Sequence, residues 1–270
     1  MHSSTERIIR DDSGGSLWCE TAGSGMPVIF LHGFTFDASS WDPQFAALDD
    51  AYLRIRYDLR GFGRSSDPIG KHDHGADLLS ILRSCDVESA HLVGLSLGAD
   101  VALSFALSHP EHVRGLLLAS PGLPGFEWRN ERPPDGAKRV ARLHGIEAGK
   151  AFWLNHPVFA SARERPDVAK ALLGMVNRYR GWHWSEGAQA CMPGSNAPRL
   201  PEVRCPTLII NGMRDVTENL EIGTALSKGI ESARRLTFGG TGHLVNMEAP
   251  ERFNQAMLRF LVGDPWLSWL

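Results

Sequence analysis

The chain has 270 residues, of which 43% are apolar and 22% are charged, and this composition excludes a disordered protein or a fibrous rod. Its length fits one large domain, or one domain that carries an inserted subdomain. With 28 Lys and Arg against 31 Asp and Glu, the formal net charge is −3, so the composition provides no basic face and predicts no nucleic-acid partner.

Short apolar segments alternate with helical ones from residue 27 onward, a pattern typical of βα units around a parallel sheet. Residues 7–10 and 17–21, with a turn sequence at 11–15 between them, predict an antiparallel hairpin at one sheet edge. Further strands are expected at residues 28–31, 53–58, 91–95, 115–120, 207–211 and 235–238, and helices at 74–82, 97–107 and 250–261. The sequence therefore predicts an α/β fold with a mostly parallel eight-stranded sheet and helices on both faces.

The strand rhythm stops after residue 120 and resumes only at residue 207. We predict that residues 125–200 form a helical lid, inserted into a core domain of residues 1–124 and 201–270. A lid needs aromatic side chains to shape an apolar pocket, although packing inside the lid is the simpler role for any one of them. The candidates for the pocket wall are Trp128, Trp153, Trp182 and Trp184.

The run Gly94-Leu95-Ser96-Leu97-Gly98 is a G-x-S-x-G motif. By itself such a match is weak, because a serine here could simply be a helix N-cap. Its position between a predicted strand and a predicted helix makes it specific. There the serine occupies a strained turn that exposes its hydroxyl, and the glycines allow the neighbouring backbone to approach.

With these residues the chain resembles the α/β-hydrolases. Four further segments match motifs of that family: His32-Gly33-Phe34, the D-x-R-G-x-G-x-S run of residues 58–65, Asn211-Gly212-Met213-Arg214-Asp215, and Gly242-His243. Trp41 also stands where many members carry Trp. The resemblance extends from about residue 15 to residue 262, apart from the insertion.

A serine hydroxyl needs a base, and the base needs an orienting carboxylate. The resemblance implies that Ser96 is the nucleophile, His243 the base and Asp215 the acid, with the backbone N–H groups of Phe34 and Leu97 forming an oxyanion hole. Glu218 stays open as the acid, since this chain lacks the Pro that often follows the aspartate; Asp215 is favoured because it directly follows the strand and its glycine turn. The other ten histidines are expected to be structural, with His32 packing the oxyanion loop.

Ser96 argues against epoxide hydrolases and haloalkane dehalogenases, which use a carboxylate nucleophile. Residues 41–67 and 239–250 most resemble 3-oxoadipate enol-lactonases, related esterases and cofactor-free perhydrolases. This resemblance implies a serine hydrolase that cleaves an ester or lactone of a small, largely apolar substrate through an acyl-enzyme. Two alternatives stay open: a carbon–carbon hydrolase of meta-cleavage diketones, and a non-catalytic ligand receptor of the same fold.

No apolar run reaches the roughly 18 residues that span a bilayer, and the first residues do not resemble a signal peptide. The four cysteines, Cys19, Cys85, Cys191 and Cys205, form no C-x-x-C pair, and no zinc-site spacing is present, which favours free thiols in a reducing compartment. We therefore expect a cytoplasmic enzyme that has a small-molecule substrate and no membrane partner, cofactor or metal. Self-association into a homo-oligomer is left open.

Overall fold

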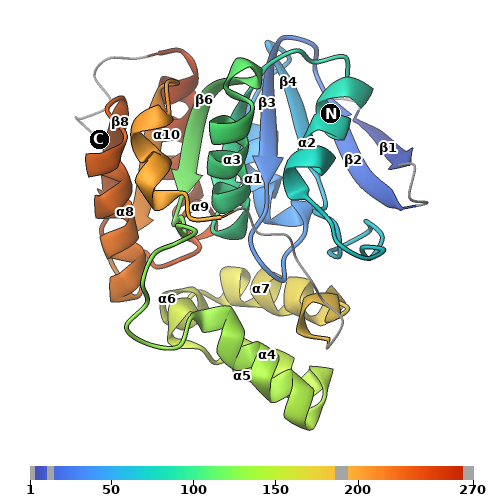
Figure 1. Ribbon diagram of the computed structural model, residues 1–270, viewed down its shortest axis with the longest axis vertical. Helices are drawn as coiled ribbons and strands as arrows, with labels where there is room; N and C mark the ends of the chain where they lie inside the picture. Colours follow the sequence, from blue (N-terminus) through green and yellow to red (C-terminus); the bar gives the residue numbers. More distant parts are fainter. Residues whose placement is uncertain (1–3, 11–14, 186–193, 264–270) are drawn as a thin grey trace.

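A central eight-stranded sheet organises the protein in the computed structural model, which describes residues 4–10, 15–185 and 194–263 (Figure 1). The strands are β1 (Thr5–Arg10), β2 (Ser16–Ala22), β3 (Met26–Leu31), β4 (Tyr52–Tyr57), β5 (Ala90–Leu95), β6 (Val113–Ala119), β7 (Thr207–Gly212) and β8 (Ala233–Phe238). Residues 11–14 of the predicted turn, Cys191 and the tail of residues 264–270 lie outside the described residues.

The strand order is β1-β2-β4-β3-β5-β6-β7-β8. The hairpin of β1 and β2 lies at one edge, β2 runs antiparallel to β4, and every other neighbouring pair is parallel. All the predicted strands form, with ends within two residues of those expected. The central strands are apolar and buried because helices cover both of their faces, so the prediction of a mostly parallel α/β sheet is confirmed.

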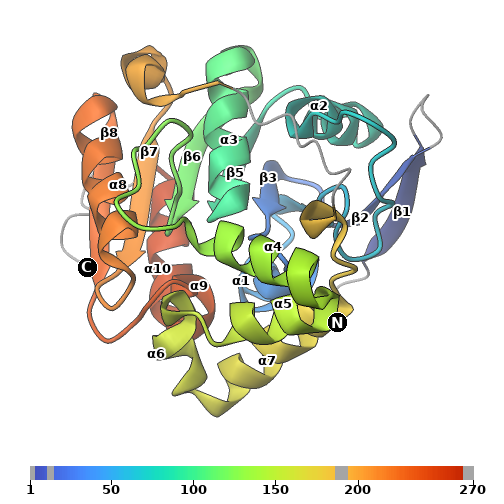
Figure 2. The same cartoon turned by 60° about the horizontal axis from the view of Figure 1, so that its bottom comes forward.

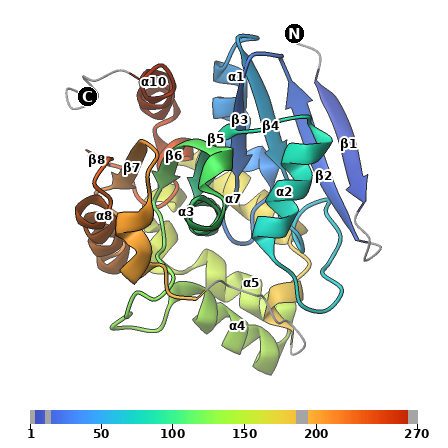
Figure 3. The same ribbon diagram turned by 45° about the horizontal axis from the view of Figure 1, so that its top comes forward.

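Helices cover both sheet faces, with α2, α3 and α8 on one side and α1 and α10 on the other (Figure 3). The helices are α1 (Asp42–Ala47), α2 (His74–Ser84), α3 (Leu97–Ser108), α4 (Pro133–His144), α5 (Ile146–Leu154), α6 (Ala160–Arg163), α7 (Pro166–Arg178), α8 (Thr217–Gly229), α9 (Val245–Glu248) and α10 (Pro250–Leu261). The helix predicted at residues 250–261 forms as α10, and its apolar side chains are buried: Phe253, Met257, Phe260 and Leu261.

The segment between β6 and β7, called the helical insertion below, contains α4 to α7. These helices lie together beneath the ends to which the parallel strands point (Figures 1 and 2). Short 3-10 turns complete the chain: η1 (Ala38–Trp41), η2 (Pro110–His112), η3 (Pro157–Phe159), η4 (Trp182–Trp184) and η5 (Ala197–Glu202). Within the described residues, no helix is both long enough and apolar enough to cross a membrane.

Candidate active site

Ser96 occupies the sharp turn between β5 and α3. Its backbone has a φ of 52° and a ψ of −112°, a region that residues other than glycine rarely adopt. The Ser96 N–H still donates to the carbonyl of Ala119 on β6 at 3.0 Å, so the turn remains attached to the sheet. Such strain persists only where the surrounding structure imposes it, and it is common at functional sites.

The two glycines of the motif are required by close backbone contacts. A Cβ on Gly94 would lie 2.5 Å from the backbone of Gly98, and a Cβ on Gly98 would lie 2.1 Å from the carbonyl oxygen of Leu31. A side chain at either position would therefore push α3 away from the sheet. The close approach that the sequence predicts for this turn is confirmed.

His243 and Asp215 meet although 27 residues separate them in the sequence. The Asp215 Oδ2 atom lies 2.8 Å from Nδ1 of His243, and both side chains are buried. The other carboxylate oxygen accepts hydrogen bonds from the Val216 N–H at 2.8 Å and from Nδ2 of Asn219 at 3.0 Å. Burial alone would lower the pKa of His243, but the charge of Asp215 and its hydrogen bond outweigh burial and raise this pKa.

Glu218, the other acid left open by the sequence, points elsewhere. Its carboxylate accepts a hydrogen bond from Nδ2 of Asn130, in the helical insertion, at 2.7 Å. Of the two acids, Asp215 is thus the one that contacts His243.

The loop after β3 brings Phe34 close to the same place. His32 holds this loop, because its Nε2 accepts the N–H of Leu59 at 2.9 Å and its Nδ1 lies 2.8 Å from the carbonyl of Gly33. Leu97 is the first residue of α3, so its N–H has no acceptor within the helix. In the part of the chain that the structure describes, the N–H of Phe34 has no acceptor either.

A cavity of about 660 Å³ connects these groups. Ser96, His243, Phe34 and Leu97 all line it. The helical insertion contributes aromatic side chains to its wall, among them Trp128, Trp153 and Trp184.

Trp182, the fourth predicted wall residue, is not part of this lining. Its ring packs edge-on against His183 and His72, at centroid distances of 4.9 and 5.5 Å. This packing turns the side chain away from the position that the sequence predicts for it.

The sequence gives no role to three residues that the structure brings to the site. Asn219 lies four residues after Asp215, Asp100 lies four residues after Ser96, and both line the cavity. This spacing of about one helical turn is the sequence signal that could have identified them. Burial raises the pKa of Asp100 to about 7. Glu248 accepts the N–H groups of Gly242 at 2.8 Å and Leu244 at 3.2 Å, on either side of His243.

Comparisons with known proteins agree with this geometry. A family model described as the alpha/beta hydrolase family matches residues 28–256. A 2-hydroxy-6-oxononadienedioate/2-hydroxy-6-oxononatrienedioate hydrolase of Paraburkholderia xenovorans is 29% identical over an alignment of 282 positions, gaps included, that covers 96% of each chain.

Two solved structures have similar folds. Est816, described as an N-acyl homoserine lactone degrading enzyme, superimposes with a TM-score of 0.80 at 26% identity, covering 94% of this chain and 100% of that one. A thermophilic esterase from Thermogutta terrifontis gives a TM-score of 0.80 at 26% identity, covering 96% of this chain and 98% of that one.

Proposed function

Because the chain belongs to the alpha/beta hydrolase family, we propose that it is a serine hydrolase that cleaves a carboxylic ester or lactone of a small, largely apolar substrate. The observation that best supports this proposal is the buried Asp215–His243 hydrogen bond of 2.8 Å, next to a cavity that His243 shares with the strained Ser96.

In the proposed mechanism, Asp215 keeps the proton of His243 on Nδ1, which leaves Nε2 free to accept the proton of Ser96. The Ser96 oxygen attacks the carbonyl carbon, and the N–H groups of Phe34 and Leu97 donate hydrogen bonds to the oxygen that becomes negative. His243 then protonates the departing alkoxide or enolate. A water molecule, activated by His243 in the same way, hydrolyses the acyl-enzyme and releases the acid.

An ester or lactone is favoured because its leaving oxygen can be protonated directly by His243, without a further acid group. The aromatic lining of the cavity suits a small apolar substrate, and the helical insertion is proposed to act as the lid. Carbon–carbon hydrolysis is the second candidate, because the Paraburkholderia relative is named as a hydrolase of 2-hydroxy-6-oxononadienedioate, which belongs to the same class as the dienol diketone of that reaction. That reaction also requires ketonisation of a dienol.

A substrate panel tests this proposal with p-nitrophenyl acetate, p-nitrophenyl butyrate, a small enol-lactone and a ring-cleaved dienol diketone. We expect turnover of an ester or the lactone, and a loss of about 10⁴-fold or more in a folded Ser96→Ala variant. Mass spectrometry after organophosphate treatment should find the adduct on Ser96.

Three results would contradict the proposal. Selective turnover of the diketone would show that the protein is a carbon–carbon hydrolase. Tight binding of a panel compound, without turnover of any of them, would show that it is a non-catalytic ligand receptor. Full activity of Ser96→Ala would remove the serine from the mechanism.

A further inference from the structure

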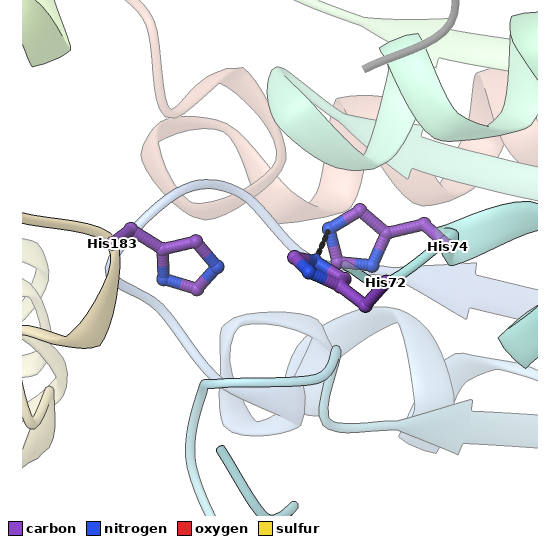
Figure 4. A group of neighbouring side chains, drawn as sticks. All are labelled: His72, His74 and His183. Carbon is purple, nitrogen blue, oxygen red and sulfur yellow. Dashed lines mark hydrogen bonds between the residues drawn. The ribbon is translucent and has the colours of Figure 1, made fainter. Parts of the chain in front are cut away.

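Three buried histidines from two distant segments meet near the cavity (Figure 4). His72 precedes α2 and His74 begins it, whereas His183 lies in η4 of the helical insertion. One ring nitrogen of each lies within 4.8 Å of the corresponding nitrogens of the other two. His74 and His183 also line the cavity wall.

The local backbone explains why His72 and His74 point the same way. Asp73 between them is extended, with a φ of −127° and a ψ of 114°, and in extended chain alternate side chains lie on the same side. Their Nε2 atoms are 3.4 Å apart. From the opposite side, His183 is held by stacking on Phe62, with ring centroids 4.2 Å apart.

Each of these rings has a nitrogen without a partner. Nδ1 of His72, Nδ1 of His74 and Nε2 of His183 are buried and make no hydrogen bond within the described residues, and the residues are only 7%, 5% and 9% exposed. Leaving a buried polar atom unpaired is destabilising. On His183 the unpaired Nε2 is the atom available to an ion, because Nδ1 faces the Tyr179 hydroxyl; His72 and His74 turn their Nε2 atoms toward each other.

Positive charge near the cluster would oppose the binding of a metal ion. The cation Arg60 is paired with Asp77, with Nη2 and Oδ1 2.6 Å apart, so its charge is balanced.

Two of the ligand atoms have the spacing of a tetrahedral site. With metal–nitrogen bonds of about 2.0–2.1 Å, two ligand nitrogens lie about 3.3 Å apart, and the Nε2 atoms of His72 and His74 are 3.4 Å apart. A ring nitrogen of His183 belongs to the same group, within 4.8 Å. On His183 and His74, the ring nitrogen that points away from the cluster lies near an oxygen atom. Nδ1 of His183 is 3.1 Å from the Tyr179 hydroxyl, and Nδ1 of His74 is 4.0 Å from Oδ2 of Asp77. Metal-binding histidines are commonly oriented by such oxygens.

We propose that His72, His74 and His183 bind one divalent transition-metal ion, of the nitrogen-preferring class that includes Zn²⁺ and Co²⁺, and that this ion joins the helical insertion to the start of α2. The sequence predicts no metal site, because His183 is far from the other two in the chain and they match no zinc-binding spacing. An all-imidazole set favours these ions over Ca²⁺ and Mg²⁺, which require oxygen ligands.

Calorimetric titration of the EDTA-treated, dialysed protein with Zn²⁺ tests the site. We expect one equivalent to bind with a micromolar or lower Kd, and His74→Gln and His183→Gln each to weaken binding at least 10-fold. His91→Gln is the matched control, because Nδ1 of the half-buried His91 is likewise shielded and without a hydrogen bond within the described residues, but the residue lies outside the cluster. Circular dichroism without metal checks that each variant folds.

Two further measurements are made on the wild-type protein, the second with His183→Gln as its control. Co²⁺ added to the wild-type protein should give the visible absorption of a tetrahedral site. Hydrogen exchange of residues 179–184 should be slower with Zn²⁺ than with EDTA, and this protection should disappear in His183→Gln.

The proposal is overturned if no stoichiometric Zn²⁺ binding is found, or if both glutamine variants bind Zn²⁺ as the wild type does. Binding at the cluster without protection of residues 179–184 would overturn the link between the insertion and α2.

Discussion

At the scale of single residues, Asp215 and Glu218 differ in the side chains that they contact. Asp215 faces His243 and receives two further hydrogen bonds, from Val216 and Asn219. Glu218 is only three residues away in the sequence, yet it is bound by Asn130 of the helical insertion. The carboxylate that keeps the histidine proton on Nδ1 is therefore proposed to be Asp215.

Substituting the two acids tests this difference. Asp215→Asn should lower kcat by about 10⁴-fold, because an amide does not hold the required tautomer of the histidine. Glu218→Gln should change kcat by no more than about 10-fold. Ester or lactone hydrolysis measures both effects, with circular dichroism as the check on folding, and the opposite ranking would transfer the role to Glu218.

At the scale of elements, the loop between β8 and α9 carries His243, and Glu248 holds it on both sides of this residue. Glu248 accepts N–H groups on both sides of His243, and its carboxylate also accepts the hydroxyl of Ser161 in α6 at 2.5 Å. Its negative charge contributes to the raised pKa of His243, after the larger effects of burial, which opposes the rise, and of Asp215, which supports it. Glu248 is therefore a positioning residue that also acts electrostatically.

The pH profile of Glu248→Gln tests this role. The base works in its neutral form and its pKa is raised, so wild-type kcat/KM should fall as the pH decreases through a value above 6.5. Removing the Glu248 charge should move this limb to lower pH, and the loosened loop should lower kcat by roughly 10- to 100-fold. Glu251→Gln, at an exposed residue of α10, is the control. A lower kcat with an unmoved limb would leave Glu248 with a structural role alone.

At the scale of the whole molecule, the helical insertion contacts three segments that adjoin proposed site residues. The contacts are those of Trp153 with Thr35, of Asn130 with Glu218 and of Ser161 with Glu248. The indole Nε1 of Trp153 donates to the Thr35 hydroxyl at 2.8 Å, next to Phe34. The insertion therefore contributes to the cavity wall and to the positions of these segments.

The size selectivity of the cavity tests the role of the insertion as a lid. Trp153→Ala enlarges the cavity and should raise kcat/KM for bulky relative to small acyl groups by about 10-fold or more. Trp182→Ala should leave this ratio unchanged, because Trp182 does not line the cavity. Assays well below the melting temperature are needed, since removing a buried Trp costs about 3–5 kcal/mol. The same ratio of kcat/KM for bulky and small acyl groups in Trp153→Ala and Trp182→Ala would contradict the role of the insertion as a lid.

The sequence by itself determined the sheet, the turn at Ser96 and the order of the motifs. These features depend on local causes: apolar periodicity sets each strand and helix, and the glycines at 94 and 98 are needed wherever a strand turns this sharply into a helix. Consecutive parallel strands also bring their following loops to one edge of the sheet, so the group of site residues could be anticipated.

Only the tertiary structure decided which side chains meet across that edge. The choice between Asp215 and Glu218 depends on Asn130, the orientation of Trp182 depends on the histidines it packs against, and Glu248 reaches the His243 loop through a short helix. The cluster of His72, His74 and His183 likewise forms only when the helical insertion packs against the start of α2. Such contacts join residues far apart in the chain, and no local periodicity encodes the packing that brings them together.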